Sequence, residues 1–246
     1  MNPTNRNENG YISVKIGKNL FPVLTLILIL TTGISLTFGK YPVAFPDMIR
    51  FFLYKVLNVG YVAPETYHLL GSLFLDIRLP RILAAVLIGA SLSVSGAAFQ
   101  AMFVNPLVSP SLLGVLAGAS FGAALGMVFS KSWLTVQVLT FTFGFVAVLI
   151  SVGIARIHKG DTILLLVLGG VISGALFTSL LSIIKYIADP YNQLPAITQW
   201  LMGGLSFVDG RILLAIGIPQ VLSIILVILF SGYLNALSMG DEEARA

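Results

Sequence analysis

The most informative feature of this chain is the length of its uninterrupted apolar runs. Six runs carry no Asp, Glu, Lys or Arg, and about 20 apolar residues are needed to cross the hydrocarbon core of a bilayer. Within lipid the backbone must satisfy its own hydrogen bonds, so each run is predicted to be a helix. The pattern therefore predicts an all-α, polytopic membrane helix bundle of about six transmembrane helices. The six runs are Leu20–Phe38, Ile82–Val104, Ser111–Ser130, Trp133–Ala155, Ile163–Ile184 and Ile212–Tyr233.

Two of the connections between these runs are predicted to hold short helices. The connection Gly39–Leu79 is long and mixed in polarity, and its stretch Asp47–Leu57 is predicted to form a helix on the membrane surface. The connection Tyr186–Gly210 is too polar to span. Its segment Ala196–Leu205 is predicted to be an interfacial helix, because the Trp200 it contains favours that depth.

Small residues recur at helical spacing within the apolar runs. Residues four apart lie on one face of a helix, and stripes of small side chains let neighbouring backbones approach closely. These stripes predict a compact multi-helix bundle through simple packing, and they do not indicate a pore. The stripe in the third run is Gly114, Gly118, Gly122 and Gly126; others are Ala85, Gly89, Ser93, Ala97 and Ala101 in the second run and Gly170, Gly174, Thr178 and Ser182 in the fifth.

Composition narrows the class of protein further. Charged residues make up only 10% of the chain, against about 25% in a typical soluble domain, so a soluble globular domain is excluded. The chain has no cysteine, and its two histidines, His68 and His158, lie outside the apolar runs. Thiolate metal sites and histidine-based metal sites within the membrane are therefore excluded, and we expect no metal and no cofactor. The net charge of +4 is ordinary for a protein in contact with anionic membrane lipid and predicts no nucleic-acid partner.

The middle of every run lacks ionisable side chains, which limits the chemistry the chain can perform. Proton relays and ion-coupled transport commonly need intramembrane ionisable groups or broken helices around an ion. An intramembrane enzyme would need a general acid, a base, a nucleophile or a metal, and is disfavoured. The sequence also lacks a GxxxxGK[ST] nucleotide loop. Active transport would therefore need a separate ATPase subunit, and a passive channel remains compatible with the same observations.

Four segments of the chain form a characteristic series. They are Arg78-Leu79-Pro80-Arg81 at the start of the second run, Asn105-Pro106-Leu107 followed by Leu113-Gly114-Val115, Trp200-Leu201-Met202-Gly203-Gly204, and the stretch from Leu234 to Arg245. In order and spacing these segments resemble the FecCD-type permeases, which are membrane subunits of ABC importers for iron-siderophores, haem and vitamin B12. The resemblance runs from about Leu20 to the last residue.

The resemblance implies an orientation of the chain in the membrane and a partner protein on the outer side. It places the tail of residues 1–19 in the cytoplasm, although the distribution of Lys and Arg does not orient the chain by itself. It implies that Arg78 and Arg81 face outward and dock carboxylates of a periplasmic or lipid-anchored substrate-binding protein. An arginine fork can bind a carboxylate through two hydrogen bonds. The alternative is a pair of arginines that anchor the helix end to lipid headgroups.

On the cytoplasmic side, the resemblance implies that residues 234–246 begin a coupling element that sits in a groove of the ATPase. Small and apolar Leu237, Gly240 and Ala244 would match the pattern of that element, and Glu242 would face solvent or the ATPase. Without the resemblance the same segment would be a polar tail. Thr162 lies just after the connection that corresponds to the family's cytoplasmic gate.

The resulting expectation is that residues 1–246 form one transmembrane permease domain in a prokaryotic cytoplasmic (inner) membrane. The chain would pair with a second permease subunit and an ATPase, and would pass a metal chelate, first of all an iron-siderophore, by alternating access. The family fold has about ten helices, with the coupling element after the sixth, so the resemblance implies a chain truncated after the sixth helix. A non-transporting fragment or assembly scaffold and a passive channel are the alternatives.

Overall fold

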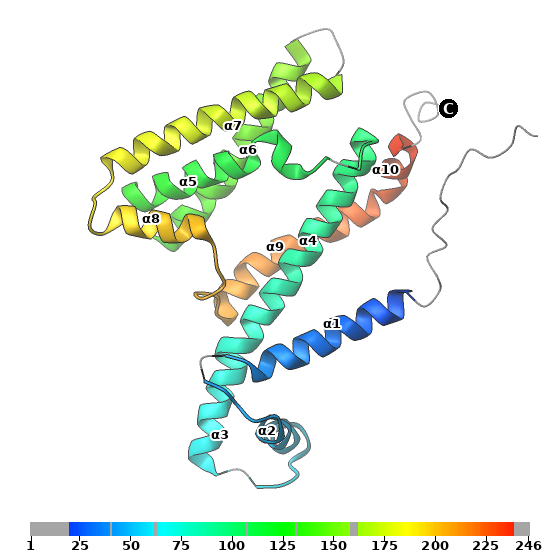
Figure 1. Cartoon of the computed structure of the whole chain (residues 1–246), viewed down its shortest axis with the longest axis vertical. Coiled ribbons are helices and arrows are strands. Elements are labelled where there is room, and N and C mark those ends of the chain that lie inside the picture. Colours follow the sequence, from blue (N-terminus) through cyan, green and yellow to red (C-terminus); the bar gives the residue numbers. More distant parts are fainter. Residues whose placement is uncertain are drawn as a thin grey trace, which may run out of the picture. The chain divides into compact units, whose positions relative to one another are not determined.

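The computed structural model describes residues 20–39, 41–61, 63–106, 108–130, 132–157 and 162–238, and all regular structure in these ranges is helical (Figure 1). Five helical segments are long and apolar enough to cross a membrane. The prediction of an all-α polytopic helix bundle is confirmed. The five segments are α1 (Leu20–Thr37), the run Pro64–Phe103, α6 (Trp133–Ile157), Ile163–Ile187 within α7 (Thr162–Ile187), and α9 (Gly210–Leu229).

The chain divides into two compact units, Met1–Ile82 and Leu83–Ala246. In the first unit, a connection of seven residues joins α1 to α2 (Phe45–Leu57). Next come α3 (Pro64–Gly71), a π-helical segment labelled η1 (Ser72–Arg78) and the start of α4 (Leu79–Phe103). The last three join into one helical run of 40 residues. The prediction that the whole chain forms a single permease domain stays a prediction.

The helix α2 occupies the stretch predicted to be a surface helix, and local sequence explains both of its ends. Pro46 lies in the first turn, where its missing N–H removes no intrahelical hydrogen bond. Asn58 ends the helix in the left-handed conformation; its N–H donates to the carbonyl of Tyr54, and the N–H of Val59 donates to that of Leu53. Asn is one of the few residues besides Gly that tolerates this conformation.

The core of the first unit is a cluster of aromatic and apolar side chains between α2 and the helical run that begins at Pro64. The ring of Phe51 is fully buried, and its centroid lies 5.5 Å from the ring centroids of both Tyr67 and Phe74. Aromatic pairs at this separation contribute about 0.5–1.5 kcal/mol beyond the area they bury. Met48 and Leu70 complete the contact, which fixes α2 against α3 and η1.

The second unit is built around three helices that pack against one another, α5 (Val115–Phe129), α6 and α7. A 3-10 turn labelled η2 (Pro110–Leu113) leads into α5, and α8 (Gln193–Met202) covers one side of it. The chain then continues through α9 to α10 (Ser231–Ser238). The core centres on Phe121, whose ring meets that of Phe143 edge-on at 4.9 Å between centroids.

The third apolar run differs from the prediction of one continuous span from Ser111 to Ser130. Its first residues form the η2 turn, and Gly114 then adopts φ of +75°, so α5 has only 15 residues. A helix of that length is about 22 Å long, shorter than the hydrocarbon core of about 30 Å. The physical cause is local: Pro110 opens a tight turn, and Gly114 takes the left-handed conformation that the following helix start requires.

Candidate functional site

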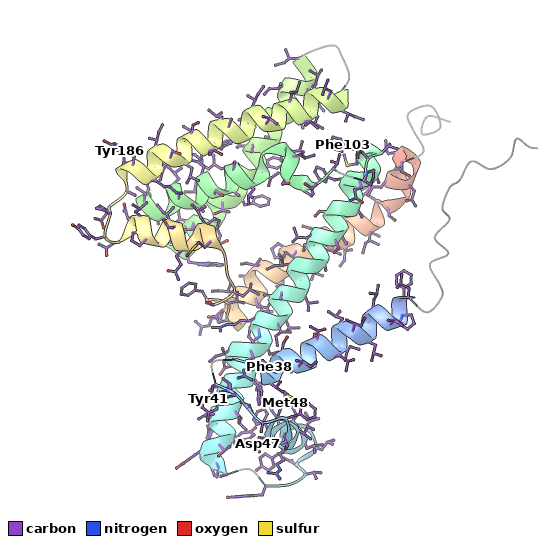
Figure 2. The ribbon with its side chains drawn as sticks, in the orientation of Figure 1. Phe38, Tyr41, Asp47, Met48, Phe103 and Tyr186 are labelled. Carbon is purple, nitrogen blue, oxygen red and sulfur yellow. The ribbon has the colours of Figure 1, made fainter. Side chains whose placement is uncertain are left out.

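The arginine at the start of the outer motif, Arg78, is buried in the first unit. It ends the π-helical segment, and only 7% of its surface is exposed. Its guanidinium donates hydrogen bonds to the backbone carbonyls of Leu36, at the end of α1, and of Tyr41, in the connection to α2. The guanidinium carbon lies 5.6 Å from the ring centroid of Phe74, in cation–π range. One side chain therefore ties three segments of the first unit together (Figure 2, where Phe38 and Tyr41 mark the connection).

Gly39, in the connection after α1, lies close to this guanidinium. A Cβ at Gly39 would lie 3.0 Å from Nη2 of Arg78, so a larger residue there would press on the guanidinium. The backbone carbonyls that Arg78 binds belong to residues at and just beyond the end of α1, where helix carbonyls lack intrahelical partners. A cation at that end also complements the helix dipole. This contact was not predictable from the sequence, because 37 and 42 residues separate Arg78 from its two acceptors.

The two arginines of the predicted docking pair therefore differ in their exposure to solvent. Arg81 lies one helical turn after Arg78, at the start of α4, and is partly exposed. The guanidinium of Arg78 is not presented to solvent, and it does not stand beside Arg81 as a second outward-facing fork. In this conformation two backbone carbonyls draw the side chain of Arg78 inward. Docking of a binding protein by Arg78 and by Arg81 stays a prediction.

The glycine stripe of the third run meets two different helices. A Cβ at Gly118 or Gly122 would overlap a backbone carbonyl oxygen of α6, that of Phe143 or Leu139 respectively. At Gly126 a Cβ would lie 2.8 Å from the Cα of Val136, also in α6. These three glycines set the close approach of α5 and α6. Gly114 precedes α5 and faces a different helix. A Cβ at Gly114 would lie 3.0 Å from the backbone nitrogen of Gly174, in α7.

Two buried serines lie where the η2 turn, α6 and α7 pack together. The hydroxyl of Ser151 lies 3.0 Å from the carbonyl oxygen of Leu113 and 2.9 Å from that of Ala147, so it donates to one of the two. Ser173, in α7, donates to the carbonyl of Ala147 at 3.0 Å, and both serines are fully buried. A Cβ at Gly170 would overlap the carbonyl oxygen of Leu112. The break before α5 is therefore a tightly packed junction of three helices.

Within this junction, Gly170 was a candidate from its spacing in the sequence, whereas neither serine was. The available signal for Ser173 was the sequence Gly169-Gly170 followed by Ser173-Gly174, which places small residues on two adjoining faces of α7.

A cavity of about 620 Å³ lies within the second unit, between α5, α6, α8 and the turn after α8. Its polar lining comes from neutral side chains, among them Gln137, Gln199 and the indole of Trp200, and no ionisable residue lines it. The third motif forms one wall, because Gly203 and Gly204 have φ of +77° and +147° and turn the chain back after α8. Such a cavity can offer hydrogen bonds to a guest but no net charge.

The cytoplasmic candidates are described only in part. Leu237 lies in α10 and is exposed, whereas Gly240, Glu242 and Ala244 fall outside the described residues, as does the tail of residues 1–19. Thr162 is the first residue of α7, which places it at a helix start after the undescribed residues 158–161. Their roles in coupling and gating stay predictions.

These features are those of a polytopic α-helical membrane protein. Its short helix α5 packs closely against its neighbours through glycines and buried serines, and an uncharged cavity lies beside it. Residues 26–246 match the model of the FecCD transport family. The chain belongs to the FecCD transport family, as the resemblance of its four motifs predicts.

Curated relatives and a solved structure agree with this family. The chain is 34% identical over 223 residues to the molybdate import system permease protein MolB of Haemophilus influenzae, covering 91% of this chain and 65% of MolB. It is 33% identical over 224 residues to the "Probable iron chelatin transport system permease protein" of Helicobacter pylori, covering 90% of this chain and 64% of that one. The chain thus spans about two thirds of the length of these relatives.

The solved structure carries the description "An inward-facing conformation of a putative metal-chelate type ABC transporter". It matches with a TM-score of 0.74 at 32% identity, covering 92% of this chain and 67% of that one.

Proposed function

We propose that this chain supplies membrane-spanning helices of the permease subunit of an ATP-driven importer for metal chelates. The observation that carries the proposal is the likeness to a metal-chelate type transporter, which combines a TM-score of 0.74 with 32% identity over 92% of this chain. The subunit contributes no hydrolytic chemistry of its own. ATP binds and is hydrolysed in a separate ATPase subunit, and that cycle drives alternating access in a membrane assembly of two permease subunits.

On the outer side, the importer receives its cargo from a substrate-binding protein that docks at the start of α4. Arg81 meets a carboxylate of that protein, since a guanidinium binds a carboxylate with two parallel hydrogen bonds. Arg78 acts through position: it fixes the α1–α2 connection against η1, one turn before Arg81. Because the residues around it are held in place, Arg81 loses less conformational freedom on docking than an arginine on a mobile segment would.

On the inner side, α10 leads into the element that couples the permease to the ATPase. Leu237 is an exposed apolar residue on this short helix, which suits a contact with a groove of a partner protein. Gly240, Glu242 and Ala244 would continue the same contact, with Glu242 on its polar side. Thr162, at the start of α7, belongs to the cytoplasmic gate.

The cargo we propose is an iron-siderophore. The neutral lining of the cavity near α8 supports a large chelate whose charge is delocalised, because fixed charges would bind it strongly and slow its release. A second candidate is molybdate, supported by the relative whose printed name is that of a molybdate import permease. A small oxyanion would depend on the neutral hydrogen-bond donors that line the cavity, such as the side-chain amides of Gln137 and Gln199.

Reconstitution tests these alternatives together. The chain is placed in proteoliposomes with the ATPase and binding protein of its own transport system, and uptake of a labelled ferric siderophore or of molybdate is followed with and without ATP. ATP-dependent uptake of the siderophore supports the proposal, whereas ATP-dependent uptake of molybdate alone selects the second candidate. Flux without ATP would identify a passive channel. Insertion into the membrane with neither capture of the ATPase nor uptake would identify a non-transporting fragment or assembly scaffold.

A further inference from the structure

The helix α2 carries two apolar faces, and only one of them is covered within the first unit. Met48 and Phe51 are buried against α3 and η1. The second face is a stripe that we call the outer stripe, formed by residues at spacings of four, four and three, which lie along one side of a helix. Its side chains are between 40% and 74% exposed: Phe45, Ile49, Leu53 and Val56.

Charged side chains of α2 avoid the outer stripe and flank it. Arg50 and Lys55 lie on its two sides, and Asp47 lies across the helix, where it pairs with Arg50 at 3.7 Å. The Lys55 ammonium reaches back over the ring of Phe51 at 5.9 Å. An apolar stripe with cations along its margins is the pattern of a helix that lies in the plane of a lipid surface, where long basic side chains reach the phosphates.

Three features of the first unit place α2 at the level of a membrane surface. It begins only eight residues after α1 ends, and α1 is an apolar span without a single buried residue. Arg78 holds the connection between them to the end of α1. Four of the eight tyrosines of the chain fall within residues 41–67, and tyrosine favours the zone between hydrocarbon and water.

The direction of the α2 axis is consistent with a position at the membrane surface. Figure 1 shows α2 along its axis, whereas α1 and α3 run in the plane of the view, so α2 lies across both of them. A helix that lies across a spanning helix at the end of its apolar stretch runs along the bilayer surface.

We propose that α2 is an interfacial anchor that binds membrane lipid directly. The outer stripe enters the boundary between headgroups and acyl chains, where such helices sit about 5–10 Å deep, and Arg50 and Lys55 contact the lipid phosphates. Burying these apolar side chains in lipid removes from water the surface that the fold of the first unit leaves open. The anchor fixes the height of the α1–α2 connection, and therefore of Arg78 and its surroundings, relative to the bilayer.

Because the natural chain has no cysteine, single cysteines can report on this surface in the full chain. Ile49→Cys and Val56→Cys place an environment-sensitive fluorophore on the outer stripe, and Asp47→Cys is the matched control on the other side of α2. Each variant is reconstituted in nanodiscs containing phosphatidylglycerol. Nitroxide-bearing lipid quenches from the membrane, and iodide quenches from the water.

The proposal expects blue-shifted emission at positions 49 and 56, with quenching by nitroxide lipid and loss of quenching by iodide, and the reverse at position 47. The double substitution Arg50→Gln and Lys55→Gln should reduce the blue shift in anionic nanodiscs toward its value in zwitterionic ones. Equal iodide quenching at positions 56 and 47 would overturn the proposal by leaving the stripe in water. Protection from both quenchers would also overturn it, because a protein segment or a second copy would then cover the stripe.

Discussion

The close approach of α5 and α6 predicts a measurable effect from a single methyl group at Gly118. A Cβ at this position would overlap the carbonyl oxygen of Phe143 and lie 2.8 Å from the Cβ of Ala147. Carbon atoms pack best at about 3.5–4.0 Å, so the contact with Ala147 alone requires the helices to separate by about 1 Å. Neither neighbour can rotate away, because one is main chain and the other is a Cβ fixed to it.

The expected magnitude follows from two opposing effects of Gly118→Ala. Overpacking a close contact destabilises by about 1–3 kcal/mol, whereas replacing Gly by Ala within a helix is favourable by up to about 1 kcal/mol. Gly153→Ala, in α6, is the matched control, since a Cβ there meets no atom within 4 Å. Both variants gain the helix preference and only Gly118→Ala suffers the overlap. The difference between them should therefore be about 1–3 kcal/mol.

The measurement is reversible unfolding of the purified chain in mixed micelles, with the fraction of denaturing detergent as the variable and helix content as the signal. A second readout is the crosslinking rate of two cysteines introduced across α5 and α6, which should fall when the helices separate. Equal unfolding midpoints for Gly118→Ala and Gly153→Ala would refute the reasoning, because the contact with α6 would then carry no energy.

Three further predictions concern other parts of the chain. Ser151→Ala should destabilise by about 1 kcal/mol, as expected for a hydrogen bond between membrane helices, whereas Ser91→Ala, whose hydroxyl bonds only within its own helix, should leave the unfolding midpoint unchanged. Arg81→Glu should weaken binding-protein affinity in surface plasmon resonance, and Arg156→Glu, at the last turn of α6, should not; equal losses would indicate a general charge effect. Leu237→Asp should reduce co-purification of the ATPase, and full retention would remove Leu237 from the coupling contact.

Apolar run length predicted most of the helices because lipid leaves the backbone few alternatives. Apolar run length did not predict the helical residues that precede Ile82, where the sequence includes charged side chains. The run that contains α4 begins at Pro64, well before the predicted start at Ile82, because Glu65, Asp76 and Arg78 interrupt the apolar pattern without breaking the helix. Charges end a predicted membrane span, but they do not end a helix, for which Asp, Glu and Arg are tolerated residues. Pro64 itself was the visible signal, since proline favours the first turn.

The candidate site was predictable only where a single helix carried the pattern. The spacing of Gly118, Gly122 and Gly126 defines a face whichever helix covers it. Gly114 shares the spacing but not the helix, because the turn before α5 rotates it toward α7. Ser151 was not predictable, since an isolated serine in an apolar run is common and the carbonyl that it reaches in η2 lies 38 residues away. Contacts of that separation depend on tertiary packing, which a single sequence does not contain.

Arg78 and Arg81 share one motif, yet the contacts of Arg78 predict that conservative substitutions will separate their roles. A guanidinium presents several donors in a rigid plane and can hold two carbonyls at once, whereas a lysine ammonium is a compact charge on a flexible stem. Arg78→Lys should therefore release the α1–α2 connection and speed cleavage by chymotrypsin after Phe38, while Arg81→Lys leaves that rate unchanged.

For binding-protein affinity the order should reverse. Arg81→Lys loses the bidentate contact with a partner carboxylate, whereas Arg78→Lys acts only through the position of the connection and should lower affinity less. Unchanged cleavage in Arg78→Lys, together with a loss of affinity as large as that of Arg81→Lys, would show that Arg78 touches the partner itself. The buried guanidinium would then have to turn outward on docking and break both carbonyl hydrogen bonds.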